Sequence, residues 1–162
     1  MKRLILILAV ASTMLALVSE ALADKPTREF LPADDAVLEG ICPFAVEVQV
    51  LANNSYIKTF SDGRQLINGT LKVRLTNLDE PSRSLDANIS GPGVQRESPE
   101  GEFVLRAKGR WLFFFFPGDL GPGEPGALVL TTGLAVLRFD ADGNGTFTHN
   151  TGTTTDVCAA LA

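Results

Sequence analysis

The amino-acid sequence predicts an all-β protein, an antiparallel meander of about 8–10 strands that follows a cleaved N-terminal signal helix. Three observations lead to this prediction. Apolar and polar residues alternate with a period of two in several runs, clusters of Gly, Pro, Asn and Asp separate the runs, and none of the runs repeats at helical spacing. Parallel strands need long crossover connections, so a chain without them should pair its strands antiparallel.

The N-terminus has the pattern of a secretory signal peptide. Basic residues open the chain, an apolar run covers residues 4–18, and residues 21–23 are Ala-Leu-Ala, an A-x-A cleavage site. A membrane-anchoring helix is the alternative, but the run is shorter than the roughly 20 apolar residues that span a bilayer, and Glu20 follows it. We expect cleavage between Ala23 and Asp24, and a secreted product without a membrane span.

The secreted part should be one domain with an acidic surface. Residues 1–23 are the signal peptide, residues 24–41 mix proline and charge and form an N-terminal arm, and residues 42–162 form a single β domain. Without Lys2, Arg3 and Glu20, the 14 Lys and Arg and 19 Asp and Glu of the full chain become 12 and 18, a formal charge of −6. This charge argues against nucleic acid and anionic membranes as partners, because both bind basic surfaces.

The clearest alternating runs should each be a strand with one buried and one solvent-facing side. They cover residues 44–50, 70–76, 85–90 and 103–108, and SYIKTF at 55–60 is a further strand. Turn sequences between runs include Asp62-Gly63, the SGPG of residues 90–93 and DADGNG at 140–145. Either a barrel or a β-sandwich satisfies this pattern.

The only two cysteines, Cys42 and Cys158, lie near opposite ends of the secreted chain. Secretion would bring them into an oxidising compartment, and no companion His or Cys cluster supports a metal pair or a reactive thiol instead. We expect one disulfide that closes nearly the whole domain, worth about 4–5 kcal/mol in the chain-entropy model. Because it would bring the first and last strands together, we favour a barrel-like closure.

The stretch RWLFFFF, residues 110–116, is apolar on both faces of a strand. Its odd-numbered large residues would face one way and its even-numbered ones the other. The next run, 127–139 around Gly133, is also apolar on both faces, and such strands are normally buried on both sides. A second layer should cover the outer face: the N-terminal arm or a second sheet, another subunit, or an apolar ligand. The possible interaction surface comprises Trp111, Phe113, Phe114, Phe115 and Phe116.

Two motifs resemble functional sites but have simpler interpretations. Asp140, Asp142 and Asn144 occupy positions 1, 3 and 5 of an EF-hand pattern, yet position 12 is Thr151 instead of the required Glu. We therefore expect a tight turn between two strands. His149 is the only histidine and lacks a nucleophile motif around it, so we expect it to be structural or exposed.

The remaining charged groups should face solvent, and we expect no catalytic residue, no metal site and no cofactor. The chain has no phosphate loop or dinucleotide fingerprint. Paired carboxylates of the glycosidase type would have to come from acidic residues at turns, which are usually solvated. The groups concerned are the pairs Asp34/Asp35 and Glu100/Glu102 and the short basic ridge Arg106, Lys108 and Arg110.

Several short stretches together resemble a group of small secreted proteins of actinobacteria and related soil bacteria. They are ICPFAVEV, TFSDGR, NISGPG, GRWLFFFF and the closing DVCAALA. These proteins have a similar Cys-x-Phe start, SGPG turn and D-x-C-A-A-L end. The resemblance implies a bacterial exported protein and supports the pairing of Cys42 with Cys158. The group has no established activity, so the resemblance implies no catalytic residues.

Two functions remain open from the sequence. The first is a non-enzymatic β domain that binds a ligand, glycan or protein, or is structural, in the extracellular space; the absence of a catalytic constellation favours it. The alternative is a small β-barrel enzyme, of the cyclase or isomerase type, acting on an apolar small molecule. A roomy interior into which Tyr56, His149 or a carboxylate converge would favour the enzyme.

Overall fold

The computed structural model describes residues 25–162, so the predicted signal peptide and its cleavage site before Asp24 lie outside the described residues. The described chain is all-β and antiparallel, as predicted, apart from one short helix. Its elements are β1 (Thr27–Phe30), β2 (Ala36–Leu38), β3 (Val46–Asn53), β4 (Tyr56–Thr59), β5 (Gln65–Asn68), β6 (Leu71–Asn77), β7 (Ser84–Asn88), β8 (Gly93–Glu97), β9 (Phe103–Lys108), β10 (Trp111–Phe115), β11 (Ala127–Thr131), β12 (Leu134–Phe139), β13 (Gly145–Thr151), β14 (Thr154–Asp156) and α2 (Val157–Leu161).

The strands form consecutive pairs, β1/β2 to β13/β14, and each pair is one long strand bent near its middle. One half of every long strand belongs to a seven-stranded sheet with the order β1-β4-β5-β8-β9-β12-β13, which is also the order of the long strands along the chain. The predicted meander is therefore confirmed. The bends explain why the strand segments outnumber the predicted 8–10.

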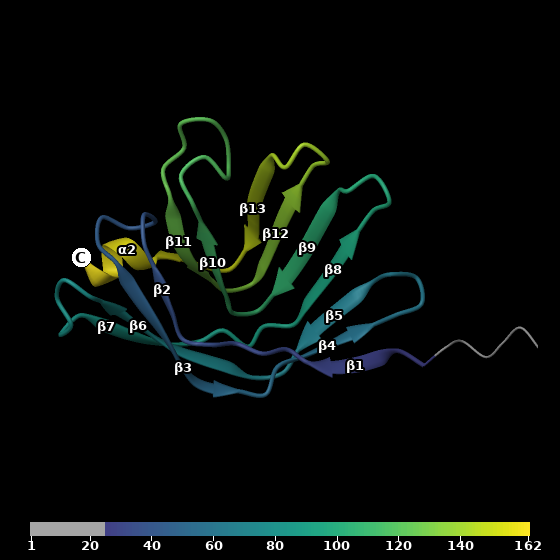
Figure 1. Ribbon diagram of the computed structural model, residues 1–162, viewed down its shortest axis with the longest axis horizontal. Helices are drawn as coiled ribbons and strands as arrows, with labels where there is room; N and C mark the ends of the chain where they lie inside the picture. The colour runs from purple at the N-terminus through teal and green to yellow at the C-terminus, as the bar shows by residue number, and fades with distance from the viewer. Residues whose placement is uncertain (1–24) are drawn as a thin grey trace, which may run out of the picture.

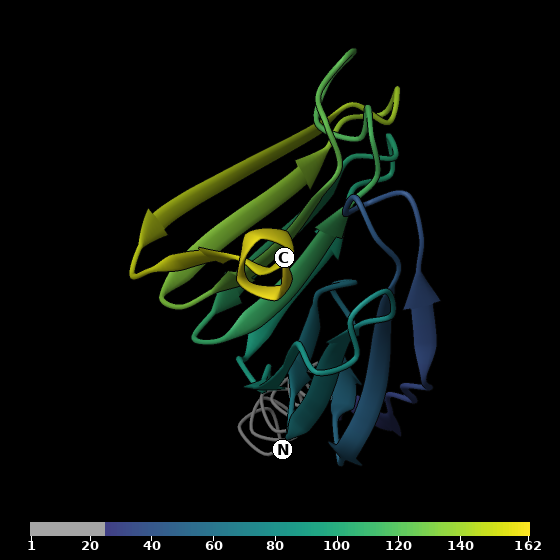
Figure 2. The same cartoon turned by 90° about the vertical axis from the view of Figure 1, so that its left-hand side faces the viewer.

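The other halves of the strands fold over the same side of the seven-stranded sheet in two groups. β2, β3, β6 and β7 form a four-stranded sheet, and β10, β11 and β14 form a three-stranded sheet. Figures 1 and 2 show the four-stranded sheet on one side of α2 and the strands β10 and β11 on the other. The three-stranded sheet is consequently a middle layer, with one face toward the seven-stranded sheet and the other toward the four-stranded sheet.

A glycine makes one of the sharpest bends possible. Gly133, between β11 and β12, has a φ of +86°, and a Cβ there would overlap the backbone of Thr151 on the neighbouring strand. Its carbonyl accepts the N–H of Gly109, at the β9/β10 bend, at 2.7 Å. The two bends therefore lie side by side, and the apolar run 127–139 is divided at Gly133 between two sheets.

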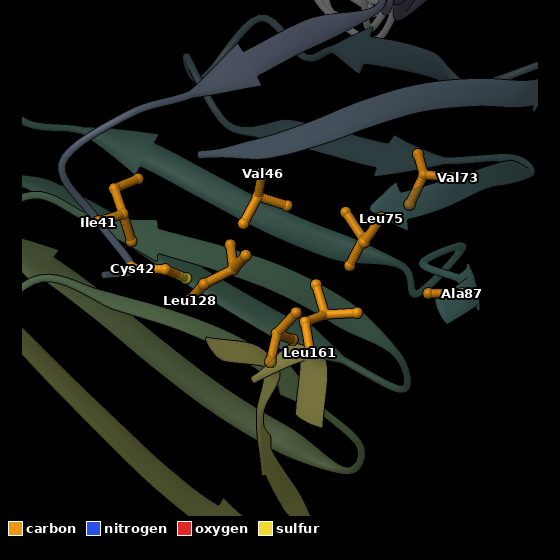
Figure 3. Packing of buried hydrophobic residues seen from close by; sticks show 9 residues of the cluster. Ile41, Cys42, Val46, Val73, Leu75, Ala87, Leu128 and Leu161 are labelled. Carbon is orange, nitrogen blue, oxygen red and sulfur yellow. The ribbon is translucent and has the colours of Figure 1, made fainter. Parts of the chain in front are cut away.

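An aliphatic core lies between the four-stranded and three-stranded sheets (Figure 3). It consists of Ile41, Cys42, Val46, Val73, Leu75, Ala87, Leu128, Val157 and Leu161. The Cys42–Cys158 disulfide is present, with the two Cα atoms 5.4 Å apart, and joins the loop after β2 to α2. The Asn77 side chain donates to the carbonyl of Leu161 at 2.9 Å and holds the end of α2 against β6.

The predicted barrel closure is wrong, because none of the sheets formed by residues 25–162 closes on itself. The disulfide brings the two chain ends together, as the sequence indicated, but through the loop at Cys42 and the helix α2. Since α2 packs its Val157 and Leu161 into the aliphatic core, helix and disulfide link the layers where strand pairing would have closed a barrel. The result is layered sheets, closer to the sandwich alternative.

The middle layer explains why RWLFFFF is apolar on both faces. Phe113 and Phe115 are buried in an aromatic core with Leu105, Ala107 and Ala135 of the seven-stranded sheet. Leu112 points the other way and packs against the aliphatic core. The predicted second apolar layer is thus supplied by the protein's own four-stranded sheet.

The second layer does not extend along the whole of β10. Phe114 is 53% and Phe116 45% exposed, and their rings pack edge to face with centroids 6.3 Å apart. The prediction that the whole second face is covered is wrong for these two side chains, because they lie beyond the edge of the aliphatic core.

Candidate functional site

The structure contains a hollow of about 360 Å³ between the inner face of the four-stranded sheet and β10. We call it the inner hollow. Val48 and Val50 of β3 and Leu71 and Val73 of β6 form its base, all on the side of these strands that the period-two pattern marks as buried. A lining this apolar, at the lower end of the usual 300–1,000 Å³ range, is typical of a small-molecule site.

Trp111 and Phe114 of β10 form the opposite side of the inner hollow. The position of Trp111 is defined by glycines of the SGPG turn, since a Cβ on Gly91 or Gly93 would overlap its indole ring. The indole nitrogen is buried against Gly91 and has no hydrogen-bond partner. This close approach explains in physical terms why the SGPG turn needs glycine at both places.

The N-terminal arm covers one side of the inner hollow and is anchored at two points. The N–H of Leu31 donates to the Ser55 carbonyl at 2.9 Å, and the Asn53 amide donates to the Leu31 carbonyl at 2.9 Å. Four residues further, the Asp35 carboxylate accepts the N–H of Val50 at 2.6 Å. Between these anchors, Ala33 and Asp34 line the edge of the hollow. Residues assigned to the arm therefore also form β1 and β2 within two of the sheets.

Few polar groups reach the inner hollow, and most of them are already hydrogen-bonded. The Ser90 hydroxyl donates to the Leu71 carbonyl and accepts the Leu71 N–H. The Asn68 carbonyl oxygen accepts the N–H of Gly69 at 2.8 Å. Asn68 is opposite Tyr56 in the strand register, so its side chain belongs to the outer face of the seven-stranded sheet and only borders the hollow. Asp34 adds an exposed carboxylate at the rim.

The side chains that would favour catalysis do not line the inner hollow. Both ring nitrogens of His149 have structural partners, Nε2 with the Thr132 carbonyl at 2.7 Å and Nδ1 with the Thr154 hydroxyl at 3.1 Å. Tyr56 lies on the outer face of the seven-stranded sheet, with the Arg28 guanidinium 3.8 Å above its ring. Neither residue lies where it could act on a molecule bound in the hollow.

The DADGNG segment is the turn that links β12 and β13. The Asp140 carboxylate accepts the backbone N–H groups of Asp142 and Asn144, at 3.0 and 2.8 Å, and the Asn144 side-chain amide at 2.8 Å. These bonds, the Asn144 side chain first, hold the pKa of Asp140 below its ordinary value. No helix flanks the turn, and no group of three or more His, Cys, Asp or Glu suited to a metal ion occurs in the described part of the chain.

The five residues of the possible interaction surface are divided by the structure. Phe113 and Phe115 are buried and Trp111 is mostly covered, so only Phe114 and Phe116 present large exposed rings. Phe114 lies at the edge of the inner hollow. Sequence reasoning missed the hollow itself, because its lining comes from five segments that only the tertiary structure brings together. The glycines facing Trp111 were the one available signal.

No protein-family model matches this chain, and no curated protein or solved structure shows significant similarity to it. The resemblance to small secreted proteins of soil bacteria therefore stays a prediction. None of the helices in residues 25–162 has the length and apolar character needed to cross a membrane.

Proposed function

We propose that this protein is a secreted, non-enzymatic binding protein that takes an apolar, uncharged small molecule into the inner hollow. The observation that carries the proposal is the chemistry of the lining: aliphatic side chains on one side, and Trp111 and Phe114 on the other. A neutral ligand fits best, because the hollow offers no cation to pair with an anion. The positions of Tyr56 and His149 favour binding over the enzymatic alternative.

Trp111, the only tryptophan, provides a direct readout of occupancy. Titrating the protein with a neutral apolar dye such as N-phenyl-1-naphthylamine should quench Trp111 emission and enhance dye emission, with saturation at one dye per chain. A linear, non-saturating response would contradict the proposal.

Two neighbouring substitutions separate binding in the hollow from binding at the surface. Val50 lines the inner hollow, whereas Leu51 is 43% exposed on the opposite side of β3. Val50→Phe should fill part of the hollow and weaken dye binding at least tenfold. The matched control, Leu51→Phe, should leave it unchanged. Equal dye affinities in the two variants would place the dye elsewhere on the protein.

Export is the second part of the proposal. The disulfide supports it, because disulfides persist in oxidising compartments outside the cytosol. N-terminal sequencing of protein recovered from the medium of an expressing bacterial host should start at Asp24. Recovery of an extracellular chain that still begins at Met1 would refute cleavage by a signal peptidase.

A further inference from the structure

The outer face of the seven-stranded sheet collects most of the cationic side chains of the secreted chain. The pairing registers place Arg28 opposite Lys58, Val94 opposite Arg106, and Val104 opposite both Arg96 and Arg138, all on one face. Seven of the 12 Lys and Arg that remain after Lys2 and Arg3 are removed lie here. We call this set the basic face: Arg28, Lys58, Arg64, Arg96, Arg106, Lys108 and Arg138.

Acidic residues are excluded from the strand positions of the basic face. The seven strands of this sheet contain two acidic residues, Glu29 and Glu97. Their register partners are Ile57 and Phe103, which belong to the opposite face. The strands of this acidic protein therefore present one whole sheet face without carboxylates.

Most cations of the basic face have no ion-pair partner. Arg64 lies 3.8 Å from Asp62 in the adjoining turn, but no carboxylate of residues 25–162 lies within 4.0 Å of the other six. On the four-stranded sheet, by contrast, Arg74 forms a bidentate ion pair with the Asp86 carboxylate, with N–O distances of 2.7 and 2.9 Å. The charge on the basic face is thus available to an external anion.

The basic face is also hollowed beside the β8–β9 hairpin. An open depression of about 1000 Å³ is lined by Arg64, Arg96 and Arg106, with Val94 and Val104 between them. Three acidic residues, Asp62, Glu97 and Glu102, also line it. The depression therefore combines apolar patches with three arginines and three acidic residues, and the further cations of the face, Arg28, Lys58, Lys108 and Arg138, lie outside it.

The spacing of the cations favours a polymer with widely spaced charges. Arg96 and Arg138 are two strands apart, about 10 Å at the usual spacing between neighbouring strands. Duplex DNA has one charge for roughly every 1.7 Å of its axis, and single strands are bound by open aromatic rings on which bases stack. Here the Tyr56 ring is covered by Arg28 and flanked by Lys58. The face lacks the charge density of a duplex-DNA site, and Phe30, opposite Tyr56 and 62% exposed, is the one large open aromatic ring that residues 25–162 present on it.

We propose that the basic face binds an acidic polysaccharide with carboxylate groups. The arginines would pair with the carboxylates, and the valines between them would contact the apolar faces of the sugar rings. The basic face is the outer face of the seven-stranded sheet, whereas the inner hollow lies on the inner side of this sheet and is lined by other residues. Polysaccharide binding and ligand binding in the hollow can therefore fail independently.

The test is binding of the mature protein, residues 24–162, to polygalacturonate, with neutral dextran as the comparison polymer. Binding should occur with polygalacturonate alone, and should weaken at least tenfold between 50 and 500 mM NaCl because salt screens exposed charges. The double variant Arg96→Glu/Arg106→Glu should lose at least tenfold in affinity at low salt.

A matched control reverses two cations outside the basic face. Lys72→Glu/Arg110→Glu changes the net charge by the same amount, and both side chains are exposed and line a separate depression next to Asp86. This variant should bind within twofold of the original protein, and circular dichroism should show both variants folded. Dye binding in the inner hollow should be unchanged in all of them.

Three results would overturn the proposal. The first is no salt-sensitive binding of polygalacturonate by the folded protein. The second is an equal loss of affinity in both double variants, which would show that binding depends on net charge and not on the basic face. The third is tighter binding of single-stranded DNA or of vesicles rich in phosphatidylserine than of polygalacturonate, which would assign the face to that class of partner.

Discussion

The four-stranded and seven-stranded sheets are built from the same bent strands but differ on both of their faces. Inside, the four-stranded sheet has an aliphatic core in which Leu75 and Val73 are at most 2% exposed, and the disulfide is next to it. The seven-stranded sheet has an aromatic core with more partly exposed members. On its outer face the four-stranded sheet pairs cations with carboxylates, as in Arg74–Asp86. The strands of the seven-stranded sheet present only cations on their outer face.

This difference indicates a division of roles within one meander. We expect the four-stranded half and the disulfide beside it to contribute more to stability than the outer face of the seven-stranded sheet, which presents cations to solvent. Substitutions in the first half should therefore change the free energy of unfolding, and substitutions on the basic face should change binding with little effect on stability.

The largest expected effect is the loss of the disulfide. Replacing both Cys42 and Cys158 by Ala should lower the free energy of unfolding by about 2–5 kcal/mol, since the bond spans a sequence separation of 116 residues. Urea denaturation followed by circular dichroism measures the change, and thiol titration of the denatured, unreduced parent protein should detect no free thiol. A double variant as stable as the parent would show that α2 holds the layers together without the bond.

A core truncation compares the two sheets directly. Leu75 of β6 is fully buried, so Leu75→Ala should cost about 2–5 kcal/mol through lost burial and the cavity it leaves. Val94→Ala, on the exposed outer face of the seven-stranded sheet, should change stability by about 0.5 kcal/mol or less. Similar losses in the two variants, measured by urea denaturation, would contradict the division of roles.

The connection between the two sheets provides a third comparison. Gly91 lies between β7 and β8, and a Cβ there would overlap the Lys108 carbonyl oxygen and the Trp111 indole nitrogen. Because a backbone atom cannot move aside cheaply, Gly91→Ala should cost about 1–3 kcal/mol and shift the emission maximum of Trp111. Unchanged stability with an unshifted emission spectrum would mean that the close packing of Trp111 on this turn is not required.

The smallest effect concerns the balanced outer face of the four-stranded sheet. The hydrogen bond from Arg74 is the main cause that holds the pKa of Asp86 below its ordinary value. The ionised carboxylate therefore stabilises the fold at pH values above the ordinary carboxyl range, and this contribution is lost as the pH falls through the lowered pKa. NMR titration of the side-chain carboxyl carbons should show the Asp86 pKa rising in Arg74→Ala. The Asp140 pKa, which depends on Asn144, should not move.

Local sequence signals predicted the strands well, because alternation and turn residues act over a few neighbouring residues. The runs at 70–76 and 103–108 became β6 and β9 with the predicted inward faces, Val73 and Leu75 in one and Leu105 and Ala107 in the other. The disulfide partners followed from there being only two cysteines. The bends, the assignment of residues 27–38 to β1 and β2, and the absence of barrel closure depend on contacts between distant segments, which the local pattern does not contain.

The sequence by itself determined an all-β antiparallel meander, two cysteines able to pair, and two strands apolar on both faces. Only the tertiary structure decided that these strands form a middle layer, that an apolar hollow opens beside Trp111, and that Arg28, Arg96 and Arg138 share a face. The physical reason is that strand alternation assigns each side chain to one of two faces. Which faces meet each other, and which remain open to solvent, depends on how the whole sheet bends.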